Sequence, residues 1–118
     1  MPEATTVFRA VDDQDLGTLT ALFAHDSRFV FGNQEPLIGI DAILAGNAAF
    51  FSMVQRTSHR LLHVRTVGGV TVAETAVTYT RLDGKDVTLP ACTVWETDEA
   101  GLITDYRVYV DTTPVFTP

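Results

Sequence analysis

The chain has 118 residues, of which 46% are hydrophobic, and it carries a formal net charge of −7 at pH 7. That length predicts one domain with one core. The acidic balance, with Lys85 as the only lysine, argues against nucleic acid and anionic membranes as partners. The single cysteine, Cys92, excludes an internal disulfide, and the N-terminal residues lack the features of a signal peptide, so we expect a soluble cytoplasmic protein.

Two short helices are expected in the first part of the chain. The first is a short helix over 5–11. The second is expected over 15–23, where leucines recur at helical spacing after Asp15, a suitable N-cap. Aromatic and β-branched side chains then predict a strand over 28–32, and residues 33–36 are typical of a turn. The chain therefore begins with helix, helix and strand.

A long helix and a strand-rich second half follow. The helix is expected to begin at 39–41 and to end near 55–57, with an apolar stripe turned toward the sheet. From Ser58 onward the sequence favours four consecutive antiparallel strands separated by hairpin turns. The expected turns are 68–69, 83–86 and 98–101. This order predicts a single α+β domain over 1–118, with a sheet that curls around the long helix into a cone.

The last strand, over 101–111, has the pattern G-x-I-x-x-Y-R-x-Y-x-D. Together with Phe23-x-x-Asp26 at a helix end and Pro36-x-x-Gly39 at a helix entry, it resembles the SnoaL-like polyketide cyclase branch of the nuclear-transport-factor-2-like superfamily. The resemblance covers nearly the whole chain. It implies a cystatin-like α+β cone, with a curved antiparallel or mixed sheet and a deep apolar cavity. Ketosteroid isomerases, limonene epoxide hydrolases and scytalone dehydratases are relatives. If the protein is an enzyme, the resemblance therefore implies an isomerase, cyclase or dehydratase that needs no organic cofactor.

Side chains along a strand alternate between its two faces, and this alternation sorts the last strand. The resemblance places Tyr106, Val108 and Val110 inside the cavity and turns Asp105, Arg107, Tyr109 and Asp111 outward. In similar cyclases and epoxide hydrolases a carboxylate occupies the position of Val108, where an apolar pocket keeps an acid ready to protonate substrate. Valine cannot supply that proton.

Other polar positions of the relatives are also replaced in this chain. The polar pair on the first strand of epoxide hydrolases falls on Phe29 and Phe31, and the Phe31 position is also that of the ketosteroid isomerase base. The Arg-x-Asp pair of epoxide hydrolases falls on Thr75 and Val77. Epoxide opening by water needs a base and an acid beside the ring, so these replacements argue against that activity.

The resemblance gives Cys92 a position inside the cavity. The two oxyanion donors of ketosteroid isomerases fall on Val7 and Cys92, and a thiol is a weak donor. The same assignment puts Pro90 and Val94 on the cavity side with Cys92, whose expected role is inert packing rather than nucleophilic attack. Trp95 then faces outward, where it can contribute to a dimer interface.

His59, just after the long helix, matches a pocket histidine of scytalone-dehydratase-like relatives and is a candidate general acid or base. The alternative is a histidine that caps the helix end or faces solvent. His63 is expected on the same strand face, but no third His or Cys is close in sequence, so no metal site is predicted. Tyr106 and Tyr79 carry hydroxyls that can orient a carbonyl, and the acidic run 12–15 is interpreted as a solvated helix junction.

Three hypotheses for function remain open. In the first, the protein is an enzyme that acts on a hydrophobic polyketide-, steroid- or terpenoid-like molecule by proton transfer, with His59 and Tyr106 as catalytic residues. In the second, the pocket only holds a small hydrophobic ligand. In the third, side chains fill the cavity and the outer face of the sheet supports a homodimer. The expected ligand contacts are Phe29, Phe31, Thr75, Val77, Tyr79, Cys92, Val94 and Val108.

Overall fold

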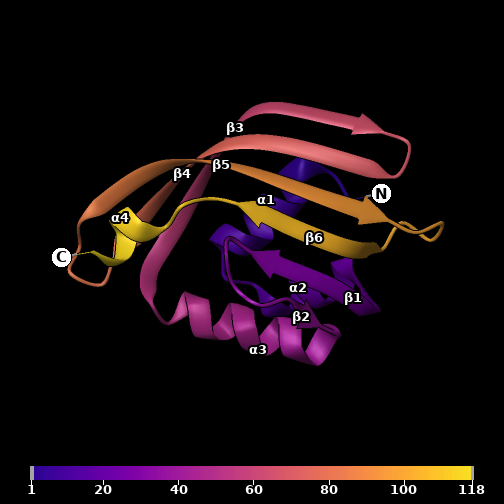
Figure 1. The fold of residues 1–118 in the computed structure, drawn as a ribbon, viewed down its shortest axis with the longest axis horizontal. Helices are drawn as coiled ribbons and strands as arrows, with labels where there is room; N and C mark the ends of the chain where they lie inside the picture. The colour runs from indigo at the N-terminus through magenta and orange to yellow at the C-terminus, as the bar shows by residue number, and fades with distance from the viewer. Residues whose placement is uncertain (1, 118) are drawn as a thin grey trace.

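The computed structural model describes residues 2–117 as a curved six-stranded sheet with four helices (Figure 1). None of the helices in this part of the chain is long and apolar enough to span a bilayer. The elements, in chain order, are α1 Ala4–Asp12, α2 Leu16–Leu22, β1 Phe23–Phe31, β2 Leu37–Ile38, α3 Ile40–Phe51, β3 Val54–Val67, β4 Val70–Arg81, β5 Asp86–Thr97, β6 Ile103–Tyr109 and α4 Thr113–Phe116.

The sheet has the strand order β2-β1-β6-β5-β4-β3, and Figure 1 shows the strands fanned in this order. The four strands β3 to β6 are antiparallel neighbours joined by hairpins, as the sequence predicts. The three predicted turns are present, and Gly68, Gly84 and Gly101 within them adopt positive φ angles that favour glycine. Strand β1 pairs in parallel with β6, so the sheet is mixed. The predicted α+β class is confirmed.

The N-terminal boundaries differ from those predicted. Phe23 belongs to strand β1 rather than to the second helix, because it pairs with Ile103 and packs its ring against Phe29 and Tyr106. Asp15 does cap the second helix, with its carboxylate accepting a hydrogen bond from the Thr18 amide at 3.1 Å. Tertiary packing of one aromatic ring therefore overrides the helical spacing of the leucines before it.

The other differences concern short elements. Helix α3 ends at Phe51, and β3 begins at Val54, four residues before the predicted start of the strand region at Ser58. The two-residue strand β2 and the C-terminal helix α4 are not predicted. Val115 of α4 is buried against a cluster that contains Val77 and Tyr79, so the end of the chain closes one end of the domain.

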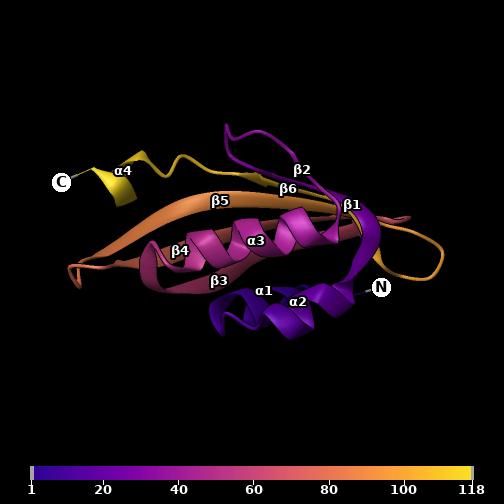
Figure 2. The same ribbon diagram turned by 90° about the horizontal axis from the view of Figure 1, so that it is seen from below.

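The main core lies between the helices and the concave side of the sheet. Figure 2 shows α1 and α2 side by side at the sheet, with α3 lying lengthwise over the strands. Val7 and Phe8 from α1, and Ile43 from α3, contact the same cluster as Trp95 and other residues of the strands. This cluster fixes the helices over the sheet and leaves a hollow between α3 and the strands, which is described below.

The structure overturns the predicted orientation of Trp95. This side chain is 0% exposed, and its ring stacks on Tyr106 at 5.9 Å between centroids and meets Phe8 edge-on at 5.8 Å. The inner face of β5 therefore carries Ala91, Thr93 and Trp95. The prediction failed because it chose the face of β5 from the resemblance, whereas burial of the largest apolar side chain outweighs the burial of a thiol.

A bulge in β3 overturns the prediction that His59 and His63 lie on the same face of the strand. Leu61 pairs with Thr75, but His63 pairs with the next residue, Glu74, so Leu62 is an extra residue in the ladder. One extra residue shifts every later side chain to the opposite face. His59 therefore faces the concave side, while His63 is exposed on the convex side.

Candidate functional site

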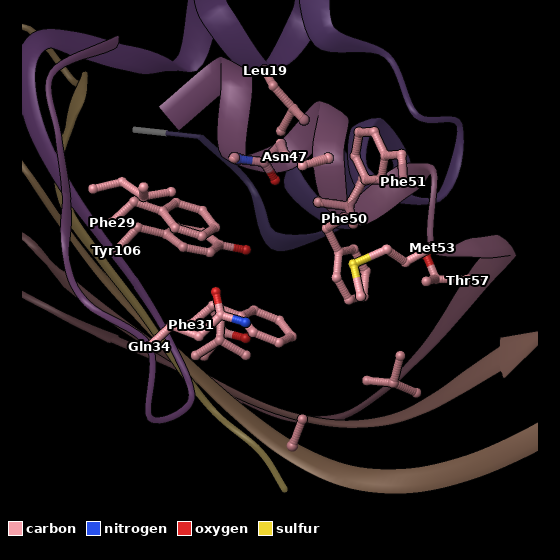
Figure 3. A pocket seen from close by; sticks show the side chains of 18 of the residues that line it. Leu19, Phe29, Phe31, Gln34, Asn47, Phe50, Phe51, Met53, Thr57 and Tyr106 are labelled. Atoms are coloured by element: carbon pink, nitrogen blue, oxygen red, sulfur yellow. The ribbon is translucent and has the colours of Figure 1, made fainter. Parts of the chain in front are cut away.

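A cavity of about 210 Å³ lies between helix α3 and the concave face of the sheet (Figure 3). Its walls are largely apolar, and none of its lining residues within 2–117 is a lysine or an arginine. The lining residues are Val11, Leu19, Phe23, Phe29, Phe31, Gln34, Leu37, Gly46, Asn47, Ala49, Phe50, Phe51, Met53, Thr57, His59, Val77, Tyr79, Ala91, Thr93, Tyr106 and Val108. An apolar wall with a few polar groups is the usual composition of a small-molecule site.

His59 lines this cavity and is held by Asp12. The imidazole Nδ1 lies 2.6 Å from Asp12 Oδ1, and the side chain of His59 is only 11% exposed. Asp12 is the last residue of α1, whereas His59 follows the start of β3, so the contact joins two elements 47 residues apart in sequence. The acidic run 12–15 is therefore not simply a solvated junction, because Asp12 turns into the protein.

Asp12 makes two further hydrogen bonds that fix its carboxylate. Thr57 Oγ1 donates to Oδ1 at 2.9 Å, and the backbone amide of His59 donates to Oδ2 at 2.9 Å. With a carboxylate on one ring nitrogen, neutral His59 carries its proton on Nδ1, and Nε2 is left with a lone pair. The His59 ring also stacks on Phe8 at 4.7 Å, so the imidazole is held in one plane beside the cavity.

Tyr106 brings a neutral phenol into the same cavity. Its ring is sandwiched between Phe29, at 4.9 Å and 10°, and Trp95, at 5.9 Å and 12°. Burial raises the pKa of the Tyr106 phenol far above its usual range, and the charges of Tyr79 and Asp12 add to this shift. Burial likewise raises the pKa of Tyr79 to about 12. Both phenols therefore stay protonated at neutral pH and can donate a hydrogen bond.

The helix side of the cavity carries one internal polar side chain, Asn47. Figure 3 shows it on α3, across the cavity from Tyr106. Asn47 Nδ2 donates to the carbonyl oxygen of Ile43 one turn earlier, at 2.8 Å. Gln34, in the turn after β1, is a second amide among the lining residues, and it is exposed.

Most of the predicted site residues meet at this cavity. His59, Tyr106, Phe29, Phe31, Val77, Tyr79 and Val108 all line it. Thr75 is buried on the same face of β4 but does not reach the cavity wall. The prediction for Cys92 and Val94 is wrong, because they lie on the other face of β5, where Cys92 pairs with Glu74 and Tyr109 in the neighbouring strands.

Sequence reasoning missed Asp12 and Asn47. A carboxylate at the C-terminal end of a helix opposes the helix dipole, so its presence there signals a stabilising partner elsewhere. Asn47 lies among the apolar side chains of the long helix, where an amide needs a hydrogen-bond partner of its own. Among residues 2–117, no three His, Cys, Asp or Glu side chains gather as they would around a metal ion.

Comparison with solved structures finds the same fold in several proteins. A nuclear-transport-factor-2-like protein of unknown function from Burkholderia pseudomallei K96243 has 18% identity and a TM-score of 0.87, with 97% of this chain and 94% of that chain covered. A protein from Jannaschia sp. CCS1 that is named after the SnoaL-like polyketide cyclases has 20% identity, a TM-score of 0.80 and coverages of 97% and 91%.

A third structure, an epoxide hydrolase from M. tuberculosis that resembles limonene epoxide hydrolase, has 19% identity, a TM-score of 0.79 and coverages of 95% and 82%. No curated protein matches the sequence. At these identities the structural likeness shows the fold alone. The sequence itself matches the SnoaL-like domain over residues 4–106. The chain therefore belongs to the SnoaL-like domain family.

Proposed function

We propose that the protein is a cofactor-independent enzyme that moves a proton within a small hydrophobic, oxygen-containing molecule, as an isomerase, cyclase or dehydratase does. The observation that carries the proposal is the Asp12–His59 pair at the wall of an apolar cavity. A histidine that is oriented by a carboxylate and shielded from solvent is the usual arrangement of a general base. The catalytic residues proposed from the sequence, His59 and Tyr106, are kept, and Asp12 is added as the positioning residue.

The chemistry follows from the protonation states of these groups. His59 Nε2 removes a proton from a carbon next to a substrate carbonyl, and the electron pair of the broken C–H bond moves onto the carbonyl oxygen. Tyr106 donates a hydrogen bond to that oxygen as it becomes negative. The imidazolium is stabilised by the Asp12 carboxylate, and its proton then returns to another carbon or to a departing hydroxyl group.

Epoxide hydrolysis is not the proposed reaction. Phe29, Phe31, Val77 and Val108 line the cavity at the positions where epoxide hydrolases are expected to carry their polar groups. Opening an epoxide by water needs one group to activate water and another to protonate the ring oxygen. The Asp12–His59 pair can act as a base, but among residues 2–117 the cavity wall contains no carboxylic acid to act as the partner acid.

The experiment measures proton exchange on small ketones. We would incubate 4-isopropylcyclohexanone and 2-tetralone with the protein in D₂O and follow deuterium at the α-carbons by NMR. Exchange should be faster with the wild-type protein than with buffer, and His59→Gln should remove the acceleration while the ketone still binds. Binding without any acceleration by the wild-type protein would refute catalysis and support the alternative, a pocket that only holds its ligand.

A homodimer is proposed as a second property, on the evidence of the convex sheet face. Tyr109 is 58% exposed there, next to half-buried Cys92 and Val94 on β5. Tyrosine and arginine are both enriched at protein interfaces, and Arg107 pairs with Val94 in the neighbouring strand. Light scattering after size exclusion should give twice the monomer mass for the wild type and the monomer mass for Tyr109→Lys. A monomeric wild type at 100 µM, on the order of cellular enzyme concentrations or above, would refute the dimer.

A further inference from the structure

The orientation of the Asn47 amide is set by chemistry. A backbone carbonyl can only accept a hydrogen bond, so the atom of Asn47 that lies 2.8 Å from the Ile43 oxygen must be Nδ2. The amide oxygen, Oδ1, is then turned the other way, and Figure 3 shows the side chain of Asn47 facing the cavity. Within residues 2–117, Oδ1 has no hydrogen-bond donor.

Oδ1 is accessible rather than fully buried, so a bound water or a ligand hydroxyl can supply the donor that the protein does not. The opposite wall has the reverse property, since Tyr106 is a phenol that stays protonated and can donate. In the part of the chain that the structure describes, the cavity wall has no lysine or arginine to balance an anionic ligand. The cavity therefore offers an acceptor on the helix side, a donor on the sheet side and no positive charge.

We propose that the ligand is an uncharged, compact ring compound whose hydroxyl group donates a hydrogen bond to Asn47 Oδ1. The cavity of about 210 Å³ exceeds the cavity of about 150 Å³ that is known to hold benzene, so a substituted six-membered ring fits it. The inference rests on the proposed function only in taking this cavity as the ligand site, and it adds that Asn47 selects for a hydroxylated substrate.

Three probes of nearly equal shape test this inference. p-Cresol carries a hydroxyl group where p-xylene carries a methyl group, and 4-methylbenzoate carries a negative charge at the same position. Dissociation constants are measured by ¹H–¹⁵N NMR titration for the wild type, for Asn47→Leu, and for Asn33→Leu as the control, because Asn33 is exposed and does not line the cavity. Leucine keeps a side chain of similar size and favours the helix, so Asn47→Leu removes the acceptor with little effect on α3. Circular dichroism verifies that the variants are folded.

We expect the Kd of p-xylene divided by that of p-cresol to fall by about three- to tenfold in Asn47→Leu, which is the ordinary strength of one hydrogen bond. The ratio should be unchanged in Asn33→Leu. An unchanged ratio in Asn47→Leu, or a change that appears only with His59→Gln, would overturn the inference. Wild-type binding of 4-methylbenzoate that is tighter than that of p-cresol would also overturn it.

The outcomes separate this inference from the proposed function. If the probes bind with no dependence on Asn47 while the ketones still exchange deuterium, only the role of Asn47 is lost. If the ratio falls as expected and no ketone exchanges, Asn47 is supported and catalysis is refuted. If none of the probes binds with a Kd below 10 mM, the cavity is not a ligand site and both proposals fail.

Discussion

Replacing Asp12 with asparagine tests the central contact of the site. The carboxylate accepts hydrogen bonds from Thr57 Oγ1, the His59 amide and His59 Nδ1, at 2.9, 2.9 and 2.6 Å. Asparagine keeps one acceptor oxygen but presents an NH₂ group in place of the other, so at least one buried donor loses its partner. The loss of one hydrogen bond to a charged acceptor predicts a destabilisation of about 2–3 kcal/mol. For a domain of this size, Tm should fall by roughly 8–12 °C.

The assay is urea unfolding followed by the fluorescence of the single tryptophan, Trp95, which is fully buried. Asp13→Asn is the matched control, because it makes the same change in charge one residue later, on an exposed side chain at the end of α1. It should change stability by less than about 0.5 kcal/mol. A loss for Asp12→Asn that is no larger than that of the control would refute the role assigned to Asp12.

Three further predictions concern other groups. Acrylamide should quench the fluorescence of Trp95 only weakly in the folded protein, because this side chain is buried. Quenching as strong as that of the chain unfolded in about 6 M urea would contradict its inward position. Burial raises the pKa of Tyr79 to about 12, against about 10 in the unfolded chain. The neutral phenol therefore stabilises the fold fully below pH 10, and this stabilisation is lost as the pH rises toward 12. The urea midpoint should fall less between pH 8 and pH 11 in Tyr79→Phe than in the wild type. Burial and then the charge of Glu74 raise the pKa of Cys92, so iodoacetamide should alkylate this thiol more slowly than free cysteine at pH 7.5. The alkylated protein should still bind p-cresol. Loss of p-cresol binding would show that Cys92 lies inside the cavity.

The order of the major elements could be predicted because it depends on local signals. Helical spacing, glycine-containing turns and alternating strands give two helices, a strand, a third helix and four more strands, and the structure has them in that order. The elements that were missed, β2 and α4, are short and are held by contacts with distant residues. Val115 of α4, for example, packs on Val77 and Tyr79, which no local pattern shows.

The site could be predicted only where the strand alternation was assigned correctly. In strand β6, Tyr106 and Val108 face the cavity as expected. In β5 the inner and outer faces were assigned the wrong way round, so that Cys92 was predicted inside and the buried Trp95 outside. In β3 the rule was broken by the extra residue Leu62. Period-two reasoning contains no information about which face is buried or where a bulge lies.

Asp12 could not be predicted as a partner of His59, because the contact depends on how α1 is placed against β3. Nothing in the spacing of 47 residues brings the two side chains together. The sequence does place this carboxylate at the C-terminal end of a helix, where the helix dipole disfavours a negative charge. That position indicates that Asp12 is stabilised by a hydrogen-bond or ion-pair partner from another element.

Among the described residues, the C-terminal helix α4 contacts residues of the cavity wall but none of the proposed catalytic residues. Val115 packs on Val77 and Tyr79, two residues of the cavity wall, whereas the match to the SnoaL-like domain ends at residue 106. Shortening or replacing residues 113–116 would uncover Val77 and Tyr79 at that end of the cavity wall and leave the Asp12–His59 pair in place. The tail is therefore the part of the chain in which directed evolution can broaden the range of accepted molecules with the least risk to proton transfer.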